Sequence, residues 1–273
     1  MSFTPSVALT IAGSDCSAGA GIQADLKTFQ HFHVHGLTAV TCVVSETARI
    51  VNSVHPVPAD IVSDQISLLL DSFPIFAAKT GMLYSAETVE AVAAVLRDRP
   101  DIQLVVDPVM VATSGGSLLE PDAVRAYREL LFPLARVITP NLPEAETLLG
   151  ERIPDETAME ASARRLSETY GTAVLLKGGH LDDADCLDLL IDRGEVHRFR
   201  DRRIAVAGSH GTGCTLSAAI AAALARGKTL QTAVQMAKKF LGDTLRRSYQ
   251  LKSPQGIAIH ALNQGTVPAE IDA

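Results

Sequence analysis

A glycine-rich turn that brings a cysteine to the start of a helix is the segment best suited to chemistry. The sequence GSHGTGC covers residues 208–214, and a run of small and aliphatic residues follows it. Backbone N–H groups at the start of a helix bind anions, and glycine lets the backbone approach a phosphate closely. We therefore predict that Gly211, Thr212, Gly213 and Cys214 form an anion-binding turn.

The thiol of Cys214 has three interpretations at this stage. The positive end of the helix lowers a thiol pKa, so a thiolate beside the phosphate could take the proton of an attacking hydroxyl. Alternatively, Cys214 is a small buried hydrophobic residue, or a covalent nucleophile with His210 as its partner. The glycine spacing does not match G-x-x-x-x-G-K-[ST], which argues against a Walker phosphate loop.

Polar and small residues also follow the apolar runs of the chain. In an open α/β sheet, ligands bind outside the carboxyl ends of the strands, so these residues predict one shared crevice. The set consists of Gly13-Ser14-Asp15, Ser45-Glu46, Lys79-Thr80-Gly81, Asp107-Pro108, Thr139-Pro140-Asn141 and Lys177-Gly178-Gly179.

The elements that must position these groups alternate along the sequence. Short β-branched runs predict strands at 7–13, 39–44, 75–81, 102–107, 135–141 and 173–179, and a hairpin over 185–204. Helical spacing predicts helices at 21–32, 59–73, 85–98, 120–132, 143–150, 154–171, 212–226 and 229–247. This order indicates an α/β fold with a mainly parallel sheet. We expect one domain over 1–273, with a weakly patterned tail from about residue 253.

Composition excludes several classes of protein. The 273 residues are 47% hydrophobic and 20% charged, with a net charge of −7, so a nucleic-acid partner is not expected. No apolar run is long enough to span a bilayer, and the first residues lack the basic start of a signal peptide. The four cysteines form no C-x-x-C pair or zinc spacing, which favours reduced thiols in the cytoplasm.

Six segments, in this order along 7–247, resemble a known kinase family. They read ALTIAGSDCSAGAGIQADLKTF, AAKTGML, VVDPVMVATSGGSLL, ITPNLPEAETLLG, LLKGGHL and SHGTGCTLSAAIAAAL. The chain thereby resembles the hydroxymethylpyrimidine/phosphomethylpyrimidine kinases of thiamine biosynthesis, in the ribokinase-like superfamily. The resemblance implies a three-layer α/β/α fold, ATP as phosphoryl donor, Mg²⁺ as cofactor and a homodimer. It also implies a small heterocyclic alcohol as substrate.

The resemblance assigns roles on the nucleotide side. Cys214 takes the position of the catalytic cysteine, with the amides of residues 211–214 as the anion hole. ATP is assigned to Lys177, Asn141 and Thr139, and the metal to Glu144 and Asp107. For Glu144, the spacing N-x-x-E offers helix capping as an alternative, and Asp107 could simply cap a strand end.

On the substrate side, the resemblance assigns the heterocycle to Gly13, Asp25, Glu46, Met82 and Val109. Asp25 lies at the edge of an apolar helical face, so its carboxylate needs a partner, either the substrate hydroxyl or a backbone amide. By its own surroundings in the sequence, Met82 is equally compatible with plain core packing.

Glu46 departs from the family pattern, because the segment VSETARIV stands where the family reads close to TAQNTLGV. A glutamine amide donates and accepts, whereas an ionised glutamate only accepts. Either a proton lies between Glu46 and the ring, or the substrate presents two donors, or Glu46 turns away to a basic residue. Because of Glu46, a kinase of pyridoxal or a related ring is the alternative function. A separate alternative is a phosphate- or heterocycle-binding protein without catalysis.

The triplet His31, His33 and His35 would form a metal-binding face only on a strand. Its place before Gly36 favours histidines at the end of a helix.

Overall fold

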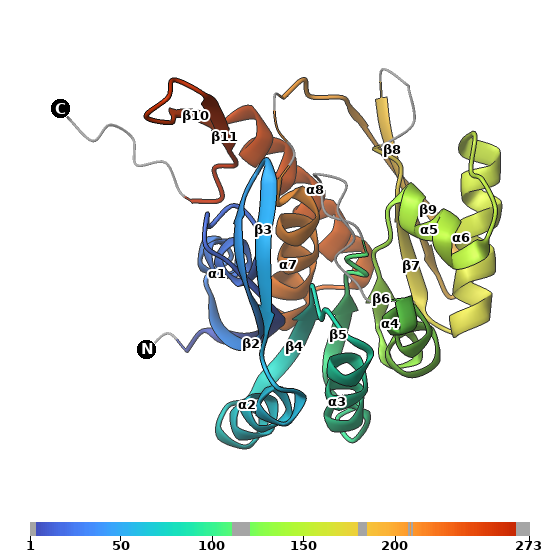
Figure 1. Cartoon of the computed structure of the whole chain (residues 1–273). Helices are drawn as coiled ribbons and strands as arrows, with labels where there is room; N and C mark the ends of the chain where they lie inside the picture. Colours follow the sequence, from blue (N-terminus) through green and yellow to red (C-terminus); the bar gives the residue numbers. More distant parts are fainter. Residues whose placement is uncertain (1–3, 111–120, 180–184, 207, 209, 266–273) are drawn as a thin grey trace.

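A nine-stranded sheet runs through the centre of the molecule (Figure 1). The computed structural model describes residues 4–110, 121–179, 185–206, 208 and 210–265. The strands follow in the order β3-β2-β1-β4-β5-β6-β7-β8-β9. Their bounds are β1 Ser6–Asp15, β2 Val34–Thr47, β3 Ile50–Pro56, β4 Ile75–Thr80, β5 Gln103–Val106, β6 Val137–Ile138, β7 Ala173–Lys177, β8 Asp185–Asp192 and β9 Glu195–Arg202.

Pairing within the sheet confirms the predicted α/β class. The strands β2, β1, β4, β5, β6 and β7 are parallel, whereas β3, β8 and β9 pair antiparallel at the two edges. Buried residues run without interruption along most of β1, as expected for a parallel strand covered on both faces. That the whole chain forms one domain stays a prediction.

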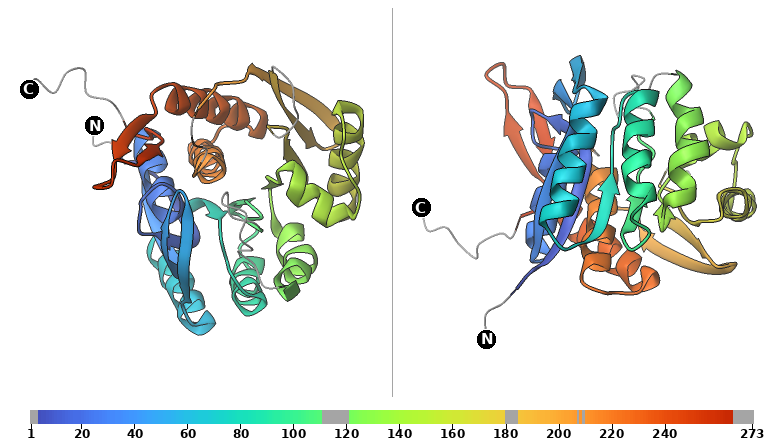
Figure 2. Two further views of the ribbon diagram at one scale, coloured as in Figure 1. Left: turned by 45° about the horizontal axis from the view of Figure 1, so that its top comes forward. Right: turned by 90° about the horizontal axis from the view of Figure 1, so that it is seen from below.

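Helices cover both faces of the sheet and give three layers (Figure 2). One hydrophobic core packs α2 Ala59–Ser72, α3 Ala86–Arg97, α4 Pro121–Ala126, α5 Leu142–Leu149 and α6 Glu156–Tyr170 onto one face. The second core packs α1 Gly21–His31, α7 Thr212–Ala225 and α8 Leu230–Arg246 onto the other. Alternate residues of β1 serve the two cores, because Leu9 and Ile11 belong to the first and Ala8 to the second.

Helix ends follow local chemistry visible in the sequence. Ser85 caps α3, its side chain accepting a hydrogen bond from the backbone N–H of Thr88. Gly150 ends α5 in the left-handed conformation, with φ of 72°. In α7, eleven consecutive residues from Thr215 to Ala225 are buried, so small side chains are required all around this helix.

Four local predictions were wrong. Strand β3 was missed, because as an edge strand its residues are mostly exposed and show no apolar alternation. The strand predicted at 135–141 keeps only Val137–Ile138, since Asn141 begins α5. The helix predicted at 120–132 ends in a π-helical turn, Tyr127–Leu131, and a 3-10 turn, Phe132–Leu134, which contains Pro133.

The fourth error concerns the weakly patterned tail from about residue 253. Its strand β11, Ala258–Ala261, pairs antiparallel with β10, Tyr249–Lys252, just before the tail. The histidine triplet is also split. His31 ends α1, His33 has a positive φ of 55°, and His35 lies in β2, so the three share no single face.

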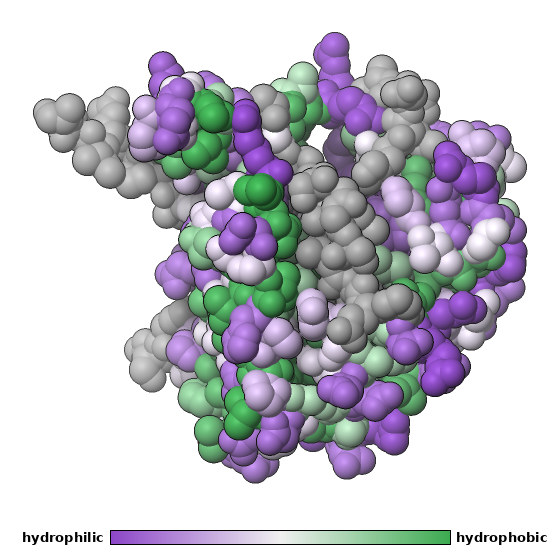
Figure 3. All heavy atoms as spheres, in the orientation of Figure 1, coloured by the Kyte–Doolittle hydropathy of each residue, from purple (hydrophilic) through white to green (hydrophobic). Residues whose placement is uncertain are grey.

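The outer surface near β3 carries exposed hydrophobic side chains (Figure 3). They belong to β2, β3, α2 and the start of β4, and comprise Val43, Ile50, Ile61, Leu68, Phe73 and Phe76. In the described ranges, no helix combines the length and apolar character needed to cross a membrane.

Candidate active site

One cavity of about 1410 Å³ collects the groups that follow the strands. Its lining includes Gly13 near the end of β1, Glu46 of β2, Met82 after β4, Asp107 after β5 and Lys177 of β7. The crevice predicted from the strand ends is therefore present. Its volume exceeds the few hundred to about 1,000 Å³ of a typical small-molecule pocket, which leaves room for two ligands.

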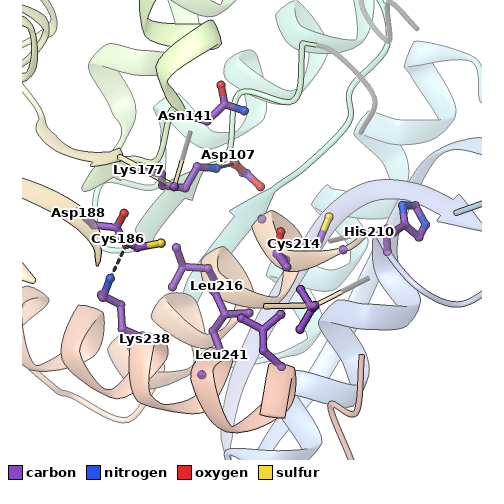
Figure 4. Close-up of a pocket in the computed structure, with 18 of the residues that line it drawn as sticks. Asp107, Asn141, Lys177, Cys186, Asp188, His210, Cys214, Leu216, Lys238 and Leu241 are labelled. Atoms are coloured by element: carbon purple, nitrogen blue, oxygen red, sulfur yellow. Dashed lines mark hydrogen bonds and ion pairs between the residues drawn. The ribbon is translucent and has the colours of Figure 1, made fainter. Parts of the chain in front are cut away.

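The start of α7 lies inside this cavity, between two groups of charged residues (Figure 4). Gly211 precedes the helix with φ of 82°, and a side chain there would overlap the carbonyl oxygen of Gly19. A Cβ atom on Gly213 would lie 3.4 Å from Oδ2 of Asp107 and 3.6 Å from Nζ of Lys177. Glycine is thus required at position 211, whereas a methyl group at position 213 would only make van der Waals contact with the ion pair.

On one side of α7, Lys177 forms an ion pair with Asp107. The Nζ–Oδ1 distance is 3.1 Å, and the lysine side chain stays 16% exposed to the cavity. Asp107 also accepts hydrogen bonds from the hydroxyls of Thr139, at 3.1 Å, and Ser217, at 3.2 Å. Burial opposes ionisation of Asp107, but Lys177 and Lys79 outweigh it and lower its pKa. Asp107 is therefore ionised and firmly held.

Asn141 and Glu144 form the capping box of α5. The Asn141 side chain accepts from the Glu144 backbone at 2.9 Å, and the Glu144 carboxylate accepts from the Asn141 backbone at 2.8 Å. Both residues also line the cavity. Burial, assisted by Asp107 and opposed by Lys177, raises the pKa of Glu144 to about 7. The capping alternative is thus correct, yet the carboxylate still faces the cavity and lacks full charge compensation.

On the other side of α7, four of the five predicted substrate residues line the cavity: Gly13, Glu46, Met82 and Val109. Met82 is half-buried, and its carbonyl accepts a hydrogen bond from the Thr41 hydroxyl at 2.6 Å. Neither Asp25 nor Thr139, which was assigned to ATP, belongs to the lining. Thr139 is buried behind Asp107, where it positions that carboxylate.

Asp25 has a different partner from the one predicted. Its carboxylate is fully buried, 2.9 Å and 3.1 Å from Nζ of Lys79, and it accepts a hydrogen bond of 2.6 Å from Thr10. Sequence reasoning offered the substrate hydroxyl or a backbone amide, because it did not place Lys79 of β4 against α1. Lys79 itself reaches the cavity.

Glu46 faces a histidine rather than a lysine or arginine. Nε2 of His210 is 3.0 Å from Oδ2 of Asp15, and ligand atoms of Asp15, Glu46 and His210 lie within 4.8 Å of one another. Burial works against protonation of His210, but Asp15 and Glu46 raise its pKa. For Glu46, burial and Asp15 raise the pKa while His210 opposes them.

The Asp15 carboxylate already accepts several hydrogen bonds. Its donors are the backbone N–H groups of Ser17, Gly19 and Ala20 and the Ser17 hydroxyl. A metal ion at this cluster would have to displace them and a histidine proton. The cluster is therefore better suited to joining the loop after β1 to the turn before α7 by hydrogen bonds than to binding a metal ion.

Cys214 lines the cavity, but the predicted thiolate is not supported. Burial raises the pKa of its thiol to about 11, with Asp25 and Asp107 adding to the rise and Lys79 opposing it. The helix field considered in the sequence is thus outweighed by desolvation. His210 bonds to Asp15, so it is not arranged as the base of a covalent thiol enzyme.

Sequence reasoning missed Lys79, Asp15 and His210 as members of the site. Lys79 and Asp15 were visible only as members of strand ends, and His210 only as a possible partner of a nucleophilic Cys214. Residues 111–119, 180–181 and 209 of the family-like segments lie outside the described residues.

Comparison with known proteins gives a consistent result. The family model described as phosphomethylpyrimidine kinase matches residues 15–258. A hydroxymethylpyrimidine/phosphomethylpyrimidine kinase of Rhizobium meliloti is 47% identical over 251 residues, covering 92% of this chain and 94% of that protein. A thiamine biosynthesis bifunctional protein of Geobacter sulfurreducens is 44% identical, covering 93% of this chain but only 52% of that protein. The chain therefore spans about half of that bifunctional relative.

Among solved structures, a pyridoxal kinase from Staphylococcus aureus in complex with AMP-PCP and pyridoxal is similar throughout. The TM-score is 0.86 with 33% identity, covering 96% of this chain and 94% of that one.

Proposed function

The chain belongs to the phosphomethylpyrimidine kinase family, and we propose that its cavity transfers the terminal phosphoryl group of ATP to a hydroxymethylpyrimidine. It is an ATP-dependent phosphotransferase with the ribokinase-like fold, and its reaction belongs to thiamine biosynthesis. The substrate is 4-amino-5-hydroxymethyl-2-methylpyrimidine. We extend the proposal to the monophosphate as the second substrate.

One observation carries the assignment of roles: the start of α7 lies in one cavity, with Lys177 on one side and His210 on the other (Figure 4). A ligand atom of Glu46 lies within 4.8 Å of one of His210. Backbone amides of residues 211–214, at the start of α7, would hold the transferred phosphoryl group. Lys177 is exposed enough to bind phosphate oxygens of ATP. The ring would lie against Gly13, Met82 and Val109, with Glu46 at its polar edge.

The residues present fit a magnesium ion. Glu144 is a cavity-lining carboxylate whose pKa is raised to about 7, so a nearby dication would relieve its unfavourable surroundings. Asp107 is the second oxygen donor, although it already holds Lys177. We propose that Glu144 and Asp107 would hold the ion, which would supply positive charge to neutralise the phosphate oxygens. Asn141 orients Glu144 through the capping box.

Phosphoryl transfer depends mainly on positioning and charge stabilisation. The hydroxyl oxygen of the substrate attacks phosphorus as the bond to the leaving ADP oxygen breaks, and ADP keeps that electron pair. The hydroxyl proton passes to an oxygen of the transferred phosphoryl group, because a neutral Cys214 thiol cannot accept it. Because the thiol pKa is about 11 in the free protein, we assign Cys214 first to positioning beside the phosphoryl group.

Glu46 can replace the usual glutamine if one proton is taken up. A protonated carboxyl donates through O–H and accepts through C=O, as a glutamine amide does with N–H and C=O. Burial and Asp15 raise the pKa of Glu46, which favours this form. We therefore propose that the aminopyrimidine edge and Glu46 share one proton.

We propose a homodimer as the assembly. The support is the exposed edge strand β3 and the hydrophobic side chains near it, Val43, Ile50, Ile61, Phe73 and Phe76. Sedimentation equilibrium should give twice the chain mass, and Ile50→Lys should shift the equilibrium toward the monomer. We place the enzyme in the cytoplasm, where ATP is supplied.

ADP release is the test of the proposed reaction. The purified chain with ATP and Mg²⁺ is offered hydroxymethylpyrimidine, its monophosphate, pyridoxal and pyridoxine in parallel. We expect kcat/KM to be highest for hydroxymethylpyrimidine, with product mass increased by one phosphoryl group. A higher value for pyridoxal would favour the second candidate, which the similarity to the Staphylococcus aureus enzyme supports. ADP formation with none of the alcohols would favour a binding protein.

A further inference from the structure

Lys79 is a buried cation that the roles assigned above do not use. Its side chain is 0% exposed to solvent and yet contributes to the floor of the cavity. Gly81 adjoins it so closely that a Cβ there would lie 2.9 Å from Nζ. A lysine is rarely buried this completely unless a partner holds its charge.

The partner is Asp25 of α1, which is itself fully buried. Both carboxylate oxygens lie within 3.1 Å of Nζ, and Thr10 of β1 donates a hydrogen bond to one of them. Burial alone would lower the pKa of Lys79, but Asp25, Cys214 and Asp107 raise it, so the lysine stays protonated. These groups come from the neighbouring elements α1, α7 and the end of β5.

Lys79–Asp25 is one of two lysine–aspartate pairs at this cavity, and the other is Lys177–Asp107. Lys177 is bound to Asp107 on the nucleotide side of α7, and Lys79 to Asp25 on the substrate side. Lys177 is 16% exposed and can touch phosphate oxygens. Lys79 has no exposed surface of this kind, so it acts through its electric field in a poorly solvated site, where fields are strong.

We propose that Lys79 is a positioning residue that stabilises negative charge at Cys214 and at the attacking oxygen during phosphoryl transfer. The proposal rests on the proposed kinase reaction. Asp25 holds the cation in place, and Thr10 fixes Asp25. The function assigned to Asp25 from the sequence, a contact with substrate, is thereby replaced by a role behind Lys79.

The main experiment neutralises both partners, because removing one alone would leave an unpaired buried charge. In the K79M/D25N variant, we expect kcat to fall by about 100-fold, the size seen when one transition-state donor is removed. We expect KM for ATP to change by less than about threefold, because bound ATP contacts Lys177 instead. The matched control is R136M/D192N, which neutralises an ion pair outside the cavity lining.

A second readout does not require kinase activity. Iodoacetamide reacts with the thiolate, so its rate at Cys214 reports the charge that Lys79 stabilises. Peptide mass spectrometry should show this rate falling by about threefold to tenfold in K79M/D25N, since one pKa unit changes the thiolate fraction tenfold. The rate at exposed Cys16 should not change. A folded K79M/D25N variant with wild-type alkylation at Cys214 would overturn the proposal.

If circular dichroism shows that K79M/D25N does not fold, Thr10→Val provides the test. It removes the hydrogen bond to Asp25 but keeps both charges. Asp25, and through it Lys79, are then held less firmly, so alkylation at Cys214 should fall by about twofold to threefold. An unchanged rate contradicts the proposal. Absence of ADP formation by the wild type would instead contradict the proposed function, whatever the alkylation result.

Discussion

The two sides of the cavity differ in how their charges are paired. On the nucleotide side, Lys177 and Glu144 remain accessible to a ligand, while Asp107 and Asn141 hold them. On the substrate side, Lys79 and Asp25 neutralise each other inside the protein, whereas Glu46 and His210 are charged or polar groups that line the cavity.

We infer that the groups on the first side bind ligands directly, whereas the buried pair on the second side adjusts the electric field around the reacting atoms. Exposed, partly compensated groups suit direct contact with a polyanion and its metal ion. Fully compensated buried pairs act through fields and geometry, which need no contact with a ligand. The following experiments test or refine that distinction.

Loss of Lys177 should have the largest effect. Lys177→Met removes a direct contact to ATP phosphate, so kcat/KM for ATP should fall by about 100- to 1,000-fold. Coupled ADP detection measures it, with circular dichroism to confirm folding. The matched control is Lys239→Met, an exposed lysine of the same cavity, which should change kcat/KM by less than about threefold. Equal losses in both variants would deny Lys177 a specific role.

Gly211→Ala should disturb both sides, because it affects the turn between them. The added methyl group would overlap the Gly19 carbonyl and adopt a positive φ. We expect unfolding free energy to fall by more than the roughly 1–2 kcal/mol that left-handed backbone alone costs. Gly227→Ala isolates that cost, since its φ is 73° and its surroundings are open. Urea denaturation compares them, and equal losses would mean that the close approach to Gly19 is unimportant.

Glu46 should give a pH-dependent effect. If substrate binding takes up one proton, KM for hydroxymethylpyrimidine rises as pH increases, because the proton becomes scarcer. Between pH 7 and 9 we expect a rise of about tenfold or more in the wild type and a flat profile in Glu46→Gln. Steady-state kinetics at saturating ATP measures both. Parallel profiles would show that Glu46 does not share a proton with the ring.

The His210–Asp15 pair should give the smallest effect, on stability. The folded-state pKa of His210 is raised, so its contribution is complete below the unfolded pKa and is lost as pH rises through the folded value. His210→Asn should lower the unfolding free energy by about 1–3 kcal/mol at pH 6 and by less at pH 9. Urea denaturation at both pH values provides the comparison. A loss that grows with pH would have the wrong sign for a protonated His210.

Local sequence signals predicted most of the framework. The apolar runs located β1 and β4, Ser85 marked the start of α3, and Gly150 marked the end of α5. These features depend on residues near one another in the chain, so their chemistry can be read directly. Edge strand β3 was not predicted, because its mostly exposed residues lack the apolar alternation that identifies a strand in a sequence.

The sequence by itself determined the order of strands and helices, the glycine turn before α7 and the polar strand ends that meet in one cavity. Only the tertiary structure decided that Asp25 pairs with Lys79, that Glu46 faces His210, and that Cys214 is desolvated. The reason is physical: ion pairing and desolvation depend on distances between segments far apart in the chain, which periodicity does not contain. The electric fields that the charged groups produce in the cavity depend on those distances.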